Sequence, residues 1–215
     1  FTIDVELEHN WLEKFQHQNK SMIVKYMGEN IKKIEMEEHS HHDHGEHAKE
    51  DHDEHENHAK EEHKDDHEEG QDPHIWTTPA NVKIIANNIF NELVRLDSKN
   101  AAYYKTNLDL FLKEINQTDK TIKEFLANTP KNTKFMVFHP AWGYFAKEYN
   151  LEQFAIESGG KNPKPKQIAY LIDEAKEENV KAIFTTPEFS INTAKQIAKE
   201  VGVQVIHVSP LNHNW

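Results

Sequence analysis

Residues 134–156 read KFMVFHPAWGYFAKEYNLEQFAI. The apolar run at 134–138 predicts a strand, 142–149 a short helix and 153–156 a second strand. The alternation continues downstream with helices and strands predicted at 165–179, 182–185, 190–202 and 203–208. Strands separated by helices in this order favour right-handed crossovers and a mainly parallel sheet. The C-terminal part of the chain is therefore predicted to be an α/β unit.

Two long helices are predicted before this unit. Apolar residues recur on one helical face over 79–97, and a second series at alternating steps of four and three runs through 104–125. Nearer the N-terminus, 1–5 and 21–27 are predicted to be short strands, with a helix starting at 8–15 between them.

The acidity of the chain is local. The 215 residues are enough to build a core, and their formal charge is −12. Residues 35–72 alone hold 17 Asp and Glu against three Lys, so the remaining residues sum to +2. Such a segment attracts cations, whereas nucleic-acid binding requires a basic face, and we expect no nucleic-acid partner. Because there is no cysteine, any metal site must rest on His and carboxylate ligands.

The acidic segment is also rich in histidine. Between 37 and 71 the only apolar residues are Ala48 and Ala59, so we expect this segment to be disordered. Neutral imidazoles suit Zn, Cu, Ni and Co, and a flexible chain can bind such ions weakly at several exchangeable sites. A purification tag or a solvated acidic linker is the simpler alternative. Ten of the sixteen histidines lie here: His39, His41, His42, His44, His47, His52, His55, His58, His63 and His67.

Other histidines stand at places where structure resumes or a strand ends. His74 lies in QDPHIW, between the polar segment and the first bulky apolar residues, where a surface or capping histidine is the ordinary alternative. His139 follows the predicted strand at 134–138, and ligands of open α/β sheets bind beyond the carboxyl ends of strands. A histidine hydrogen-bonded at a strand end is equally ordinary. His207 and His213, near the C-terminus, are weaker metal-ligand candidates.

Three motifs carry a family resemblance. DPHIW at 72–76 and FHPAWGYF at 138–145 flank the predicted long helix, and VELEHNWL at 5–12 lies upstream of the His-rich segment. In their order along the chain, these motifs resemble those of the zinc-specific, ZnuA-like subgroup (cluster A-I) of the metal-binding solute-binding proteins of ABC importers. The segment at 5–12 is similar to the end of the first lobe's strand and helix motif, without the family's glycines.

The resemblance implies an α/β fold of two lobes joined by a long rigid helix. Each lobe would be a mainly parallel sheet with flanking helices, and the first would be only partly present. The implied divisions are the end of the first lobe, the disordered metal-binding loop, a first-lobe segment with its helix, the connecting helix and the second lobe, at 1–36, 37–71, 72–97, 98–128 and 129–215.

The resemblance also implies the metal site. His74 and His139 would be the primary Zn²⁺ ligands, one from each lobe, and the family's other first-lobe histidine would lie upstream of Phe1. Ser209 stands where the family commonly has Asp, which leaves the fourth position to water, His207 or an unseen group. Three imidazoles and one open position give tetrahedral Zn²⁺.

The implied function is an extracytoplasmic zinc receptor that passes the ion to an ABC permease, with the His-rich loop as auxiliary capture or sensor. We expect a monomer, exported by a signal peptide outside this chain and located in the periplasm, or outside the cell on a membrane tether. Two alternatives stay open: a metal buffer acting through the His-rich segment, and a zinc hydrolase. No pairing of nucleophile and base is visible, so we expect no enzyme.

Overall fold

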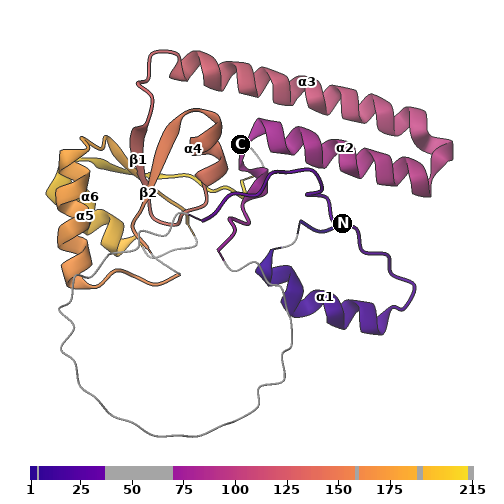
Figure 1. Cartoon of the computed structure of the whole chain (residues 1–215), viewed down its shortest axis with the longest axis horizontal. Coiled ribbons are helices and arrows are strands. Elements are labelled where there is room, and N and C mark those ends of the chain that lie inside the picture. Colours follow the sequence, from indigo (N-terminus) through magenta and orange to yellow (C-terminus); the bar gives the residue numbers. More distant parts are fainter. Residues whose placement is uncertain (4, 37–69, 158–159, 188–190, 213–215) are drawn as a thin grey trace, which may run out of the picture.

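The computed structural model describes residues 1–3, 5–36, 70–157, 160–187 and 191–212. Figure 1 shows a small sheet with two helices on it at one end, and a pair of long helices lying along each other beside it. The N-terminal part (residues 1–36 and 70–97) includes the first of the two long helices. It contacts the C-terminal α/β unit (residues 129–212).

The C-terminal α/β unit contains one four-stranded parallel sheet with the order β2-β1-β3-β4. The chain therefore leaves β1 toward one side to form β2 and returns to the other side of β1 to form β3. The carboxyl ends of β1 and β3 mark the point where the direction reverses, which is where open α/β sheets bind ligands. The predicted α/β class is confirmed. The strands are β1 Thr133–Val137, β2 Leu151–Ala155, β3 Ala182–Thr185 and β4 Gln204–His207.

Helices α4 Gly143–Glu148, α5 Pro165–Glu177 and α6 Asn192–Val201 connect the strands in turn. Strand side chains alternate between the two faces of the sheet, and one set forms the core with α5 and α6. That core includes Met136, Phe138, Phe154, Ile156, Ile183, Leu171, Ala175, Ala194 and Ile197. The next residue along each strand, such as Val137 beside Met136, faces the opposite side.

Upstream, α2 Pro79–Leu96 and α3 Ala101–Leu126 pack along each other. A short 3-10 turn, Ser98–Asn100, separates them, so the connecting helix predicted at 98–128 is α-helical over a slightly shorter range. Pro79 is the first residue of α2, a position where its missing N–H costs nothing. None of the described helices has the length and apolarity that crossing a membrane requires.

The N-terminal part has less regular structure than predicted. Helix α1, Glu6–Gln18, is present, but within the described residues the strands predicted at 1–5 and 21–27 amount to one parallel bridge between Thr2 and Tyr26. A strand needs a continuous ladder of partners, and a single bridge does not provide one. The first-lobe sheet is thus not seen in the described part of the chain.

The ten histidines of the His-rich segment fall outside the described residues, but both ends of that segment are placed. The Met36 N–H donates to the Gly70 carbonyl (2.6 Å), and Glu35 pairs with Gln71 in an antiparallel bridge. Gly70 and Gln71, predicted to be disordered, thus belong to the folded structure, because backbone pairing with the chain before the segment holds them.

Candidate metal centre

His74 is held in place by the residue two before it. The buried Asp72 carboxylate accepts from the His74 backbone N–H (2.9 Å) and lies 2.7 Å from the His74 ring nitrogen Nδ1. The His74 carbonyl in turn accepts from the hydroxyl of Thr77 (2.9 Å), the last residue of the 3-10 turn Ile75–Thr77. With Pro73 between them, Asp72 and His74 form a rigid unit in which the imidazole has little freedom to turn.

His139 stands two residues beyond the end of β1, and Glu157 two residues beyond the end of the neighbouring β2. The pairing continues past the strand ends, since the Glu157 N–H donates to the Phe138 carbonyl (3.1 Å). The buried Glu157 carboxylate is hydrogen-bonded to Nδ1 of His139. Each histidine therefore has its own buried carboxylate on Nδ1.

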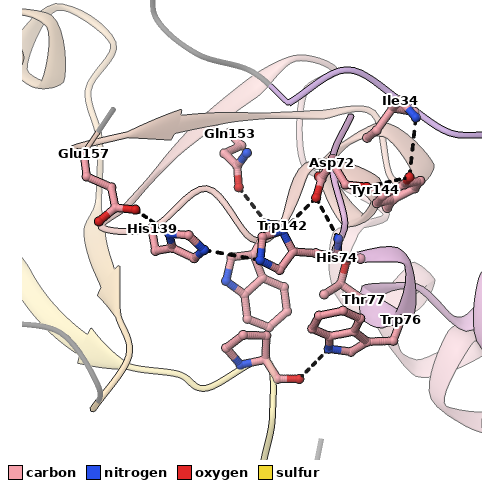
Figure 2. A network of polar contacts seen from close by, with 11 residues as sticks. Ile34, Asp72, His74, Trp76, Thr77, His139, Trp142, Tyr144, Gln153 and Glu157 are labelled. Carbon is pink, nitrogen blue, oxygen red and sulfur yellow. Dashed lines mark hydrogen bonds and ion pairs between the residues drawn. The ribbon is translucent and has the colours of Figure 1, made fainter. Parts of the chain in front are cut away.

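The two imidazoles point at each other across the boundary between the N-terminal part and the α/β unit (Figure 2). Their Nε2 atoms are 3.2 Å apart, and the ring planes lie at 77°. A carboxylate on Nδ1 keeps the proton there and leaves the Nε2 lone pair available for a metal. Two ligand nitrogens of a tetrahedral Zn²⁺, each about 2.05 Å from the ion, would be about 3.3 Å apart. The spacing of His74 and His139 matches that of two ligands on one ion.

The boundary is packed through α4. The Tyr144 hydroxyl donates to the Asp72 carbonyl (3.0 Å) and accepts from the Ile34 N–H (3.4 Å). A Cβ at Gly143 would lie 2.6 Å from Asp72 Oδ2, so only glycine lets α4 come this close. Burial raises the pKa of Tyr144 to about 12. The phenol therefore stays protonated, and so remains a donor, at any physiological pH.

A second contact brings the segment after β4 to the site. The Trp76 indole N–H donates to the Pro210 carbonyl (2.9 Å), and its ring packs edge-on against His74 with 5.4 Å between ring centroids. Ser209, next to Pro210, accepts from the Leu211 N–H (3.2 Å). The serine hydroxyl is thus engaged in its own turn.

The structure brings together only part of the predicted ligand set. Within the described residues, no third His, Cys, Asp or Glu joins His74 and His139 in a group that could hold a metal. His207 is exposed at the end of β4 and does not belong to such a group, and His213 lies outside the described residues. The sequence reasoning missed Glu157, whose place beside His139 depends on β1 and β2 being neighbours in the sheet.

A family model described as "ZnuA: Zinc-uptake complex component A periplasmic" matches residues 1–214. Among curated proteins, the chain is 29% identical over 172 residues to the zinc-binding protein AdcA of Streptococcus pyogenes, covering 79% of this chain and 30% of AdcA. It is 33% identical over 135 residues to the high-affinity zinc uptake system protein ZnuA of Bacillus subtilis, covering 62% of this chain and 42% of that protein. The chain thus spans less than half the length of these relatives.

Solved structures agree with the family match. A crystal structure of ZnuA is 33% identical to this chain and superposes on it with a TM-score of 0.80. The match covers 99% of this chain and 71% of the ZnuA chain. A ZnuA deletion mutant with zinc bound superposes with a TM-score of 0.77 at the same identity. The fold and the order of its elements are therefore those of these proteins.

Proposed function

This chain belongs to the family of zinc-uptake complex component A, and we propose that it is a receptor that captures Zn²⁺ between two lobes. Proteins of this family are solute-binding receptors rather than enzymes, in agreement with the sequence prediction. His74 is the ligand from the first lobe and His139 the ligand from the second. The captured ion passes to the membrane permease of an ABC importer.

One observation carries the proposal: Nε2 of His74 and Nε2 of His139 face each other at 3.2 Å, although the residues come from separate parts of the chain. Each imidazole is oriented by a buried carboxylate, Asp72 or Glu157. Two lone pairs directed at one point repel each other unless a proton or a metal cation lies between them. Neutral imidazoles suit Zn²⁺ better than hard ions such as Mg²⁺ or Ca²⁺, which prefer oxygen ligands.

We assign an auxiliary role in metal capture or sensing to the His-rich segment. Its two ends meet at Met36 and Gly70, and His74 follows only four residues after Gly70. The Asp72 N–H donates to the Ile34 carbonyl (2.8 Å), so the base of the segment and the His74 motif share one backbone pairing. Ions bound weakly by the segment are thereby released close to the main site.

The family description places its members in the periplasm, and we propose the same compartment, or the outer surface of a cell with a membrane tether, for this chain. We further propose that it acts as a monomer. A receptor that releases its ion to a permease needs an exposed site at the boundary between its lobes, and the His139 side chain is 25% exposed there.

The test is a zinc titration of the chain and three variants. Combined H74A and H139A substitutions should abolish the tight site, whereas H207A, at an exposed position on β4, should leave it intact. Deleting residues 37–69 should remove only weak sites. The ends of this deletion can be joined by a short Gly-Ser linker, because Met36 N and Gly70 O are already 2.6 Å apart. If the deletion instead removes all binding, the protein is a metal buffer acting through its histidine-rich segment.

A further inference from the structure

Thr186 has a buried hydroxyl that the fold does not use. It follows directly after β3, is 6% exposed, and its Oγ1 has no hydrogen-bond partner in the described part of the chain. Burying an unpaired hydroxyl is unfavourable, so such groups usually meet a partner in the functional state of a protein. The question is what lies next to it.

The register of the sheet places Thr186 beside His139. Val137 pairs with Ala155 of β2 and with Phe184 of β3, and the ladder continues with the Phe138 N–H donating to the Phe184 carbonyl (2.8 Å). Two residues beyond Val137, the same register sets His139 between Glu157 on one side and Thr186 on the other. Neighbouring strands are about 4.8 Å apart, which is within reach of a shared ligand.

Thr186 also lies on the same face of the sheet as His139. Phe138 and Ile183 belong to the core under α5 and α6, so the alternation of side chains turns Thr185 toward that core and Thr186 away from it. His139 and Thr186 thus flank the carboxyl ends of β1 and β3, where the chain reverses direction across the sheet.

The ring nitrogens of His139 are not available to Thr186. Nδ1 is bonded to Glu157 and Nε2 faces Nε2 of His74. Since no described residue bonds the Thr186 hydroxyl, a species carried by the metal itself is a candidate for its partner. A tetrahedral Zn²⁺ site that keeps an open position holds a water molecule, which is a strong hydrogen-bond donor and needs an acceptor nearby.

On the basis of the proposed zinc site, we propose that the Thr186 hydroxyl is a positioning residue for a water molecule bound to Zn²⁺. The water occupies a coordination position that His74 and His139 leave open, while the Ser209 hydroxyl accepts from the Leu211 N–H. Thr186 accepts a hydrogen bond from that water, and the formerly unpaired hydroxyl gains its partner when the metal binds.

The experiment compares Thr186→Val with Thr186→Ser, using Zn²⁺ affinity from chelator competition and the visible spectrum of bound Co²⁺. Valine should weaken Zn²⁺ binding about tenfold and change the Co²⁺ spectrum, because groups that orient metal ligands typically contribute tenfold or more. Serine, which keeps the hydroxyl, should restore both. The matched control is Thr185→Val, one residue earlier and directed toward the core, which should leave affinity and spectrum unchanged.

Thermal unfolding without metal separates this role from a structural one. Valine has the shape of threonine and removes an unpaired buried hydroxyl, so the metal-free T186V protein should unfold at the same or a higher temperature. If T186V fails to fold, Thr186→Ala provides the same readouts. Unchanged affinity and an unchanged Co²⁺ spectrum, in a protein whose tight site still depends on His74 and His139, overturn the role of Thr186 alone. Loss of dependence on those two histidines overturns the zinc site and this inference together.

Discussion

Replacing Glu157 by Gln tests whether a buried carboxylate, rather than the histidine alone, makes His139 a metal ligand. The Glu157 side chain is 3% exposed and bonded to Nδ1 of His139. Glutamine has nearly the same shape and can still accept from Nδ1–H through its amide oxygen. It can equally present its NH₂ group, which would favour the opposite tautomer and put the proton on Nε2. The substitution therefore removes the charge and the certainty of the tautomer, but not the packing.

The expected loss of affinity follows from this change. Removing a carboxylate that holds a ligating histidine typically weakens metal binding 10–100-fold, which corresponds to about 1.4–2.7 kcal/mol. Glu157 is almost completely buried, so solvent does not screen its effect on the ring. We therefore expect E157Q to fall in the upper half of that range. The His74 side of the site, held by Asp72, should remain unchanged.

The assay is competition with a chromophoric zinc chelator at pH 7.5, with E152Q as the matched control. Glu152 lies on the same strand and is exposed, so its replacement makes the same change in net charge away from the site. E152Q should bind as the unmodified chain does. If E157Q also binds zinc within twofold of the unmodified chain, the carboxylate does not set the tautomer, and His139 owes its orientation to the backbone alone.

Three further predictions concern the packing around the site. Gly143→Ala should lower the free energy of unfolding by about 1–3 kcal/mol and weaken zinc binding, because its Cβ would meet Asp72 Oδ2 at 2.6 Å. Urea unfolding measures this change, and a small gain in stability would contradict the prediction and show that α4 can shift. Trp76→Phe, which removes the bond to the Pro210 carbonyl, should speed hydrogen exchange at 209–212, and unchanged exchange would contradict this. Burial raises the pKa of Tyr144 to about 12, so the protonated phenol contributes stability that is fully present below pH 10 and is lost as pH rises through 12. Tyr144→Phe should reduce this alkaline loss of stability in unfolding titrations, and an identical pH profile would refute the prediction.

The regular elements of the C-terminal unit could be predicted because local patterns determine them. Apolar runs and helix periods gave β3 at its observed bounds, 182–185, and the other strands and helices to within a few residues. At 1–5 and 21–27 the same kind of pattern predicted strands wrongly, since the described residues there form a single bridge. A short apolar run becomes a strand only when neighbours complete its ladder, and in the described residues a single bridge, between Thr2 and Tyr26, forms there.

The site was predictable only in part for a similar reason. His74 and His139 stand in recognisable motifs, but their meeting depends on how the N-terminal part docks on α4. Glu157 and Thr186 become neighbours of His139 only once the order β2-β1-β3 is known, because strands adjacent in the sheet are not all adjacent in sequence. Residues that orient ligands carry no local signal of their own, since a buried glutamate after a strand looks like any other.

Asp72 links metal binding to the docking of the two parts of the molecule. Its side chain fixes both the backbone and the ring of His74, while its carbonyl accepts from Tyr144 and its Oδ2 atom lies against Gly143 of α4. A shift of α4 relative to Asp72 would therefore carry the unit of Asp72 and His74 away from His139. In the proposed function, release of the ion then requires no movement within either part, because loosening the contact between Asp72 and α4 separates the two proposed ligands.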